Sequence, residues 1–426
     1  MGSKKLLSQK IGVEELLEII RLWNLSAGAM RRLERIIRRD FRTGPHLFRY
    51  YVPEGLPDKV EEFERLFAKK MAIPYALAVN SCTSALIASL VACEVGPGDE
   101  VIIPAYTFFA SVSAVVIAKA IPVIAEIDHT LTIDPEDIER KITKQTKAIL
   151  PVHMIGRPCR MDEIMKIAKR YKLRVIEDVA QACGATYKGK YLGTFGDCGC
   201  FSLDFYKIIT SGEGGVITTK DEWLYTRCQS YHDTAACWRP NRFARERKPG
   251  ELFCGENYRM SQVHAAIGLA QLRKLDLIIK SLRENKNRIV QNIKKSKKFS
   301  VSISADPEGE AGTNIVLTFN DIPAAKSFSE TLTKEGISSG TMYSSRFRDW
   351  HIYSYWEHLI DRKTPTKEGC PYTCSFYKGK LPEYSADMCP RTTEILARSV
   401  IIGVSPVYNA RECRRIADII NRAANF

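Results

Sequence analysis

The sequence lacks an apolar run long enough to cross a membrane as a helix. Such a span takes about 18 or more consecutive apolar residues, and no run in the 426-residue chain approaches that length. The N-terminal stretch MGSKKLLSQKIG is charged and has neither the apolar segment nor the cleavage site of a secretory signal. These absences predict a cytoplasmic protein with no membrane partner.

Recognisable disulfide and zinc patterns are also missing. The chain has thirteen cysteines, and this odd number in a long sequence favours reduced, buried thiols over disulfides. Cys198-x-Cys200 and Cys370-x3-Cys374 each place two thiols close together, but neither pair has the spacing of a known zinc site. We therefore expect no bound metal ion.

Nucleic-acid-binding motifs are absent although the chain is strongly basic. Lysine and arginine number 63 against 49 acidic residues, which gives a net charge of +14. An excess of this size fits a nucleic-acid partner, an anionic small substrate or a basic host proteome. No helix-turn-helix, zinc finger or aromatic RNA-binding platform accompanies it. An anionic substrate is therefore favoured, and a basic nucleic-acid-binding regulator stays as the non-enzyme alternative.

The length predicts two or three domains. We expect an N-terminal helical arm over residues 1–45, a large domain over 46–285 and a small C-terminal domain over 286–426. The arm contains an amphipathic helix over 12–24, with Val13, Leu16, Leu17, Ile20 and Trp23 on its apolar face. A second helix carries an arginine-rich run of Arg31, Arg32, Arg35, Arg38, Arg39 and Arg42. That run is either a solvated face or a docking site for an acidic partner.

Helices and strands alternate regularly after the arm. A helix is expected over Lys59–Met71 and a second over Ala85–Cys93, and strands over Tyr75–Val79, Glu100–Ile103, Ile121–Ile127, Lys147–Val152 and Leu173–Ile176. This repeat predicts an α/β fold, a mainly parallel sheet with helices on both faces. A helix is expected to begin at Asn257 and run to Asp276. From Phe299 onward the mixed pattern predicts a smaller α+β domain.

One lysine stands out in the segment FSLDFYKIITSGEGG, residues 201–215. Lys207 follows Ser202 by five residues and precedes a glycine-rich turn. A lysine can act as a catalytic amine when its surroundings lower its pKa, and glycines let the backbone approach a bulky ligand. A solvated lysine beside a turn is the simpler alternative.

An aspartate upstream strengthens the functional interpretation. Asp178 falls just past the expected strand Leu173–Ile176, and ligands of α/β sheets bind outside the carboxyl ends of strands. In a pyridoxal phosphate site a lysine forms a Schiff base with the cofactor, and a carboxylate keeps the pyridine nitrogen protonated. A helix N-cap before Val179 is the alternative for Asp178. Taken together, the two motifs favour pyridoxal 5'-phosphate as cofactor.

The turn Asn80-Ser81-Cys82-Thr83-Ser84 lies between an expected strand and an expected helix. Free backbone N–H groups at a helix N-terminus bind phosphate, and nearby hydroxyls add hydrogen bonds. The turn is therefore a candidate phosphate site, with an ordinary Ser/Thr helix cap as the alternative.

At this point the chain resembles the DegT/DnrJ/StrS sugar aminotransferases, which have fold type I of the pyridoxal phosphate enzymes. The resemblance covers residues 47–280 most strongly. It is carried by six blocks in the family's order: Gly98–Pro104, Pro151–His153, Glu177–Ala182, Phe201–Lys207, Gly212–Gly215 and Asn257–Met260.

The resemblance implies a role for each residue around the cofactor ring. Lys207 would carry the Schiff base and move protons, and Asp178 would pair with the pyridinium nitrogen. Gln181 would bond the phenolic oxygen of the ring, and Phe108 would stack on the ring face.

It also implies how the phosphate is held. Ser202 and Thr83 would bind the phosphate, and Asn257 would reach the phosphate of the neighbouring subunit's cofactor, so a homodimer with shared sites is expected. The family usually has Ser-Gly-Thr where this chain has Ser81-Cys82-Thr83, which puts the backbone approach at Cys82 in question.

The implied function is transfer of an amino group from glutamate or glutamine to a keto or aldehyde carbon of a sugar, either a nucleotide-linked sugar or a sugar acid. The family also contains sugar dehydratases in which histidine replaces the lysine, and the presence of Lys207 favours transamination. A cyclitol or an aminobenzoate precursor is the alternative acceptor.

A further resemblance is to the 8-amino-3,8-dideoxy-manno-octulosonate transaminases, through Leu47–Tyr51 and Tyr231–Asp233. His153, His232 and Arg259 are candidate substrate contacts, each with a structural role as the alternative. Segments 234–250 and 341–389 are the expected specificity elements.

Overall fold

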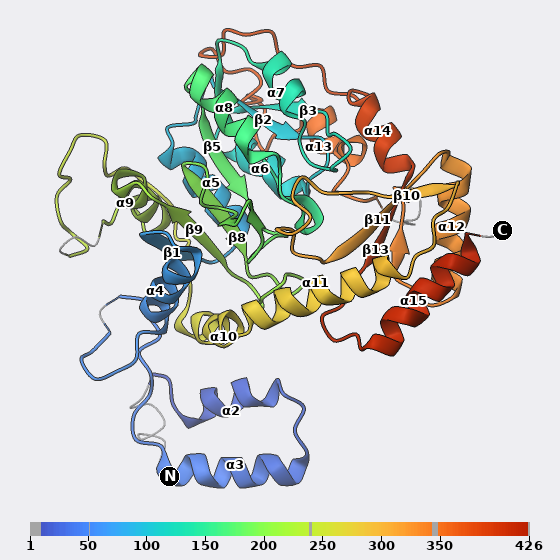
Figure 1. The fold of residues 1–426 in the computed structure, drawn as a ribbon. Helices are drawn as coiled ribbons and strands as arrows, with labels where there is room; N and C mark the ends of the chain where they lie inside the picture. Colours follow the sequence, from blue (N-terminus) through green and yellow to red (C-terminus); the bar gives the residue numbers. More distant parts are fainter. Residues whose placement is uncertain (1–9, 51, 238–240, 343–347, 425–426) are drawn as a thin grey trace.

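A seven-stranded sheet forms the centre of the molecule (Figure 1). The computed structural model describes residues 10–50, 52–237, 241–342 and 348–424. The strand order is β1-β9-β8-β5-β4-β2-β3. The strands are β1 (Tyr75–Val79), β2 (Glu100–Pro104), β3 (Ile121–Ala125), β4 (Thr146–Ile149), β5 (Arg174–Asp178), β8 (Cys198–Ser202) and β9 (Gly215–Thr219). β9 is antiparallel to its neighbours β1 and β8, and the other pairs are parallel, which confirms the predicted α/β class.

Helices cover both faces of this sheet because its strands are apolar on both sides. Leu77 and Val79 of β1 point into one core cluster, and the alternating residues Ala76 and Ala78 point into the other. The covering helices are α4 (Lys59–Met71), α5 (Cys82–Ala92), α6 (Phe109–Ile117), α7 (Pro135–Lys141), α8 (Met161–Tyr171), α9 (Glu222–His232) and α10 (Gln262–Leu272). A short hairpin of β6 (Thr186–Tyr187) and β7 (Lys190–Tyr191) and a 3-10 turn η1 (Met154–Gly156) complete this part.

The helix expected from Asn257 begins later than predicted. Residues 257–260 are extended, with Arg259 bridged to Val79 and the Tyr258 carbonyl accepting a hydrogen bond from Asn80 N–H at 2.8 Å. α10 starts only at Gln262, after the cap residue Ser261. The prediction was wrong here because backbone groups beyond the end of β1 compete successfully for this segment.

A second sheet lies beyond the long helix α11 (Leu275–Gln291). It contains β10 (Phe299–Val301), β11 (Asn314–Phe319), β12 (Ser339–Gly340) and β13 (Ser399–Gly403), all paired antiparallel in the order β10-β11-β13-β12. It shares a separate core with α12 (Ile322–Lys334) and α15 (Ala410–Ala423), as expected of an α+β unit. The predicted boundary at 285/286 falls inside α11, and the domain limits stay a prediction.

The segment 348–397 returns to the first sheet instead of joining the second. It holds η2 (Tyr353–Tyr355), α13 (Glu357–Ile360) and α14 (Pro390–Ala397). Tyr353 and Trp356 are buried in the core of the first sheet, and Ile352 bridges Tyr106 just after β2. The chain therefore brings a C-terminal segment to the carboxyl ends of the central strands.

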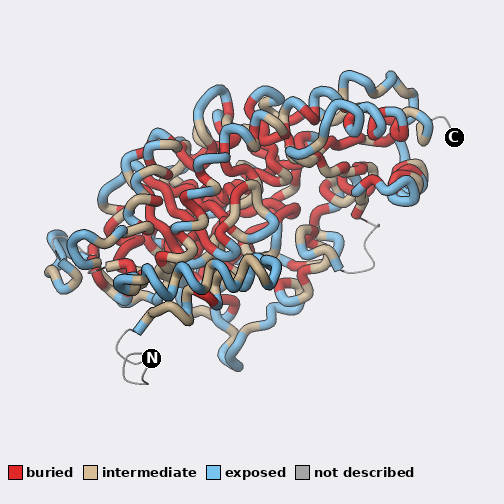
Figure 2. Tube along the Cα trace, turned by 90° about the horizontal axis from the view of Figure 1, so that it is seen from below, coloured by how far each residue is buried: buried red, intermediate tan, exposed pale blue. Residues whose placement is uncertain are grey.

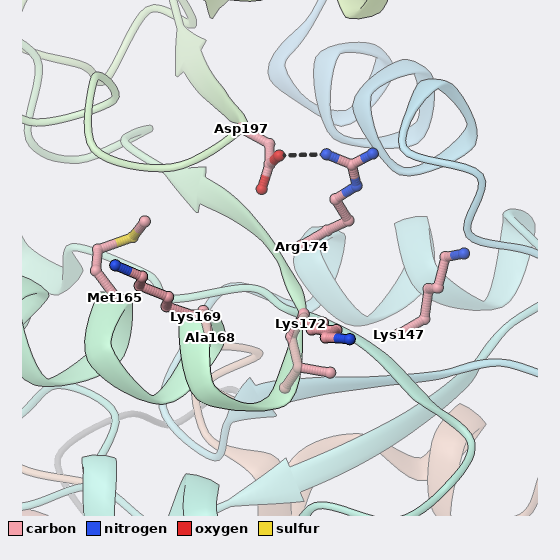
Figure 3. Close-up of a pocket in the computed structure, with 8 residues that line it drawn as sticks. Lys147, Met165, Ala168, Lys169, Lys172, Arg174 and Asp197 are labelled. Atoms are coloured by element: carbon pink, nitrogen blue, oxygen red, sulfur yellow. Dashed lines mark hydrogen bonds and ion pairs between the residues drawn. The ribbon is translucent and has the colours of Figure 1, made fainter.

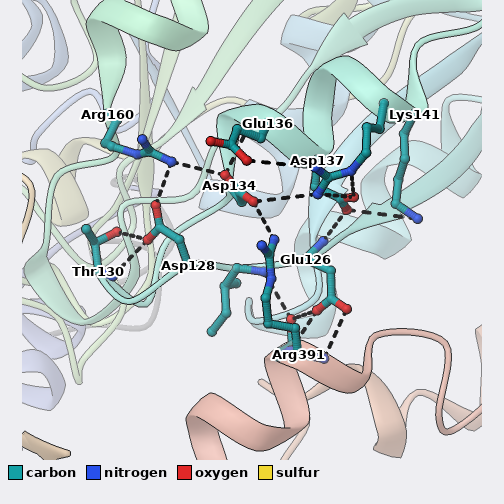
Figure 4. Close-up of polar contacts among 12 residues, drawn as sticks. Glu126, Asp128, Thr130, Asp134, Glu136, Asp137, Lys141, Arg160 and Arg391 are labelled. Carbon is teal, nitrogen blue, oxygen red and sulfur yellow. Dashed lines mark hydrogen bonds and ion pairs between the residues drawn. The ribbon is translucent and has the colours of Figure 1, made fainter.

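A buried polar network anchors this segment (Figure 4). The Glu126 carboxylate accepts hydrogen bonds from Arg391 N–H at 3.1 Å and Thr392 N–H at 2.7 Å, so it caps the N-terminus of α14. The Arg391 guanidinium also pairs with buried Asp134, which Arg160 contacts at 3.0 Å. Charge is thus compensated where α14 meets the loop after β3.

The N-terminal arm forms the two predicted helices, α2 (Val13–Arg21) and α3 (Ala27–Asp40). Leu17 is completely buried, whereas Trp23, expected on the apolar face, is 56% exposed because α2 ends two residues before it. Figure 2 shows that buried residues concentrate in the two sheet-centred parts of the molecule. Among the described residues, none of the helices is both long and apolar enough to traverse a bilayer.

Candidate functional site

A cavity of about 420 Å³ opens at the carboxyl ends of the parallel strands. It is lined by Ser81, Cys82, Thr83, Leu86, Thr107, Phe108, Ala110, Ser111, Val152, Asp178, Ala180, Gln181, Ser202, Asp204, Tyr206, Lys207, Glu213 and His351. Six of the residues predicted from the sequence are in this set: Thr83, Phe108, Asp178, Gln181, Ser202 and Lys207. The fold therefore brings together side chains from four strand ends that are far apart in the sequence.

Asp178 is the last residue of β5 and is only 5% exposed. Its carboxylate accepts a hydrogen bond from Ser111 Oγ at 2.8 Å and one from Ala180 N–H at 3.0 Å. A turn and no helix follows it, so the N-cap alternative does not hold. Burial raises the pKa of Asp178 above its ordinary value, against the two hydrogen bonds and the nearby charge of Lys207, which lower it. The site therefore favours a cationic partner for this carboxylate.

Lys207 lies in a compact loop between β8 and β9. Leu203 N–H donates to the Gly214 carbonyl at 2.9 Å, and Ser211 N–H donates to the Leu203 carbonyl at 2.9 Å, which closes the loop at its base. Gly214 adopts φ of +159°, a value open to glycine. The loop thus holds Lys207 beside the cavity while leaving Tyr206 87% exposed at its outer edge.

The segment of residues 81–84 at the start of α5 contains a helix cap and forms a backbone cradle with Gly215 of β9. Ser81 Oγ accepts a hydrogen bond from Ser84 N–H at 3.1 Å, so the ordinary-cap alternative holds for Ser81, while Thr83 lines the cavity. β9 packs closely against this turn, because a Cβ added at Gly215 would lie 2.4 Å from the Ser81 carbonyl oxygen and 2.8 Å from Cys82 N. Cys82 fits at the first position of α5 with its side chain at the cavity wall.

Gln181 lines the cavity with its amide already oriented. Its Oε1 accepts a hydrogen bond from Ile155 N–H at 2.8 Å. The Nε2 group is therefore the donor that remains for a ligand.

His351 is a cavity residue that sequence reasoning missed. Its ring lies 5.2 Å from the ring of Phe108, and its Nδ1 is 2.7 Å from Asp349 Oδ1. Burial tends to raise the pKa of Asp349, but the hydrogen bonds and charge of His351 outweigh it and hold that pKa below its ordinary value. Nothing local in the sequence marks His351, although segment 341–389 was expected to cover the site.

Two predicted substrate contacts are buried away from the cavity. His153 is completely buried, with Nε2 at 3.2 Å from Glu177 Oε2 and Nδ1 accepting a hydrogen bond from Cys159 N–H at 3.1 Å. His232 is also completely buried; its Nε2 is 3.0 Å from Arg49 Nη1, and burial next to that guanidinium lowers the pKa of His232 well below its usual value. The structure gives both histidines structural contacts and brings neither to the cavity.

Arg259 and Asn257 also lie outside the cavity of their own chain. Arg259 pairs with Asp233, which Arg242 contacts at 3.2 Å. Asn257 is exposed, and its backbone bridges Asp233. Of the expected specificity segments and the Leu47–Tyr51 block, residues 238–240, 343–347 and Tyr51 lie outside the described residues.

A second, open depression of about 680 Å³ lies at the amino ends of β4 and β5 (Figure 3). Lys147, Lys169 and Lys172 line it, and Arg174 Nη1 is 2.7 Å from Asp197 Oδ1. Lys169 and Lys172 stand at the C-terminal end of α8, where positive charge offsets the helix dipole. Asp197, the carboxylate of this depression, is paired with Arg174 and is 23% exposed in its side chain, unlike the buried Asp178. Within the described part of the chain, no group of three or more His, Cys, Asp or Glu side chains could hold a metal ion.

Comparison with known proteins identifies the family. The model of the DegT/DnrJ/EryC1/StrS aminotransferase family matches residues 56–421. The chain belongs to this family. Pyridoxal 5'-phosphate is the family's cofactor, and its members have fold type I, as predicted.

Two relatives and one solved structure show how far the similarity reaches. The chain is 46% identical over 223 residues to GDP-perosamine synthase of Caulobacter vibrioides, covering 51% of this chain and 57% of the relative's length. It is 35% identical over 331 residues to the spore coat polysaccharide biosynthesis protein SpsC of Bacillus subtilis, covering 76% and 83%. An aminotransferase from Psychrobacter cryohalolentis superposes with a TM-score of 0.71 at 28% identity, covering 87% of this chain and 92% of that one.

The cavity fits this cofactor. It offers a buried carboxylate for a protonated ring nitrogen, a lysine beside it, and a backbone cradle that leaves no room for a Cβ at Gly215. Thr83 lies in the first turn of α5, and Ser202 pairs with Gly215, which packs against Ser81 and Cys82. Both residues line the cavity next to the N-terminus of a helix, which favours an anionic group there.

The cradle yields a first prediction. Gly215→Ala should weaken binding of pyridoxal phosphate on the order of tenfold or more, about 1.4 kcal/mol, because the new methyl group displaces the turn that holds Cys82. Titration of the cofactor's absorbance measures this change. Gly96→Ala is the matched control, since a Cβ added at Gly96 would meet no atom within 4 Å. If Gly215→Ala bound pyridoxal phosphate as tightly as the wild type, the assignment of this cradle to the cofactor site would be contradicted.

Proposed function

We propose that the chain is a pyridoxal phosphate-dependent aminotransferase that moves an amino group from glutamate or glutamine to a keto or aldehyde carbon of a sugar. The observation that carries this proposal is that Lys207 and Asp178 line one cavity beside the phosphate cradle. Family membership supports the same reaction class. A nucleic-acid-binding regulator would need neither of the two side chains.

The bound cofactor supplies an electron sink for the substrate carbon. Lys207 would take a proton from the α-carbon of the amino donor and return one to the carbonyl carbon of the acceptor in the reverse half of the cycle. The neutral amine of Lys207 is the form that would accept this proton.

The other cavity residues would bind the cofactor and orient its ring. Asp178 would keep the ring nitrogen protonated, a pairing that its burial favours. Gln181 Nε2 would donate to the phenolic oxygen, and Phe108 would cover one ring face. Thr83 and Ser202 would donate hydroxyl hydrogen bonds to the phosphate.

For the acceptor we propose a nucleotide-linked keto sugar in preference to a sugar acid. The relative with 46% identity over half of this chain is named as a synthase of a GDP-linked amino sugar. The net charge of +14 suits an acceptor that carries a diphosphate. The residues that resemble octulosonate transaminases give less support, because His232 is bonded to Arg49 in a buried network.

The second prediction tests the reaction. Wild-type holoenzyme with glutamate or glutamine should convert a GDP-linked keto sugar to a product of amino-sugar mass. Lys207→Ala should lose at least about 10³-fold in turnover, as expected when the group that moves the proton is removed. Lys147→Ala, a lysine of the second depression, is the matched control and should keep full turnover.

The outcomes separate the alternatives. Loss of a hydroxyl without gain of an amino group would favour the dehydratase, and conversion of a cyclitol alone would favour the alternative acceptor. A wild-type protein that does not bind pyridoxal phosphate, or a Lys207→Ala variant with normal turnover, would refute the proposal.

His351 would contact the acceptor sugar. It stands at the cavity beside Phe108, and ionised Asp349 would hold a proton on Nδ1, leaving Nε2 as the atom that can accept a hydrogen bond.

The third prediction follows from this placement. His351→Ala should lower kcat/KM for the acceptor by about 10–100-fold, the cost of a lost polar contact to a substrate, with the cofactor spectrum and the donor half-reaction unchanged. Single-turnover kinetics of the two half-reactions measure the difference. His358→Ala, an exposed histidine of the same segment, is the control. Equal loss in both half-reactions would argue against acceptor recognition.

The proposal includes a homodimer with shared sites. Asn257 is exposed and lies outside the cavity of its own chain. Phe205, which is next to the cavity residues Asp204 and Tyr206 in the sequence, is 69% exposed. A second subunit would cover both side chains. A cytoplasmic location likewise stays a prediction.

The fourth prediction tests site sharing by complementation. If Asn257 serves the partner's cofactor, Asn257→Ala should be strongly impaired alone, but mixing it with inactive Lys207→Ala subunits should restore activity. One site of each mixed dimer then combines an intact lysine with an intact asparagine. Activity after subunit exchange measures the effect. No recovery, with mixed dimers demonstrated by mass, would show that Asn257 does not act across the interface.

A further inference from the structure

The N-terminal arm lies outside residues 56–421, the part that matches the family. Its two helices form a hairpin at the outer edge of the molecule, with α2 between α3 and the main body (Figure 1). The hairpin has its own contacts: Leu17 is completely buried, and Arg38 Nη1 lies 2.8 Å from Glu14 Oε1. The arm is therefore a folded addition, and its exposed surface needs its own explanation.

One face of α3 is cationic. At about 100° per residue, Arg31, Arg32 and Arg35 fall in one sector of the helix, opposite Leu33 and Ile37. All three arginines are exposed, and no described carboxylate lies within ion-pair distance of any of them. The acidic residues of the arm are thus not placed to neutralise this face.

The turn between the two helices is apolar and exposed. Leu22 is 80%, Trp23 56% and Leu25 41% exposed, and Ile36 of α3 is 48% exposed. Large apolar side chains that are exposed together, as Leu22, Trp23 and Leu25 are in this turn, are typical of an interaction site. Tryptophan in particular is favoured at the boundary between water and lipid, where its ring is amphipathic.

We propose that the arm docks this protein onto an anionic lipid surface. The arginine face of α3 would lie over lipid phosphates, and Leu22, Trp23 and Leu25 would enter the headgroup region. Such binding would be peripheral and would be made by the helical hairpin alone. The sequence predicts no membrane partner, and this proposal differs from that prediction.

Charge and apolar exposure together favour this occupant over others. Nucleic acid would satisfy the arginines but leave the Leu22–Leu25 tip in water. An anionic bilayer accommodates both features at once.

The fifth prediction uses the full-length holoenzyme. It should co-sediment with vesicles of phosphatidylcholine and phosphatidylglycerol but not with vesicles of phosphatidylcholine alone. The variant R31E/R32E/R35E should bind on the order of 100-fold more weakly, since each arginine near the surface contributes about 1 kcal/mol. R411E/R414E/R415E, the same change in charge on exposed residues of α15, is the matched control and should bind normally.

A second variant tests the apolar tip. L22S/W23S should lose the part of the binding that persists at high salt. Its cofactor spectrum and activity should stay normal, because neither residue lines the catalytic cavity. The proposal is overturned if the wild type ignores anionic vesicles, if it binds neutral vesicles equally, or if both arginine variants lose binding to the same extent. It is also overturned if R31E/R32E/R35E loses only duplex DNA or RNA binding, or only self-association, without a change in vesicle binding.

Discussion

The architecture of the site depends on a carboxylate buried at the end of a parallel strand. Asp178 is removed from water by the surrounding sheet and helices, and its two protein hydrogen bonds, from Ser111 and Ala180, do not offset the cost of burial, so its pKa is raised. A cationic ligand group is what this position favours. The neighbouring loop keeps Lys207 close by because its base is closed through Leu203 and Gly214. The ends of β5 and β8 thus place a buried carboxylate and a lysine at one cavity.

The C-terminal segment completes the cavity through contacts remote from it. Glu126 caps α14, and Ile352 pairs with Tyr106 at the end of β2. These two anchors hold the stretch between them against the first sheet, and His351 lies next to Ile352 in the chain. The small sheet and the cavity are therefore connected by a segment that is held by a partly buried charged network, in which Asp134 is buried and would lose a charged partner without Arg391.

The buried histidines His153 and His232 make hydrogen bonds that stabilise the fold, and neither lines the cavity. His153 links Cys159 to Glu177, and the Glu177 carboxylate also accepts N–H groups of Phe195 and Gly196. Burying such groups is costly unless each is hydrogen-bonded. The His153 network braces β5, the strand that carries Asp178, whereas His232 is bonded to Arg49, which contacts the Ala78 carbonyl of β1.

The sequence by itself determined five of the seven strands of the central sheet, the α/β class and six of the residues that line the cavity. Local periodicity encodes buried strands, and the carboxyl ends of parallel strands must meet at one edge, so Asp178, Ser202 and Lys207 converge without further information. Only the tertiary structure decided that His351 joins them, that His232 is bonded to Arg49, and that Asn257 begins an extended segment instead of a helix. Those outcomes depend on partners distant in the sequence, whose burial and hydrogen bonding no local pattern specifies.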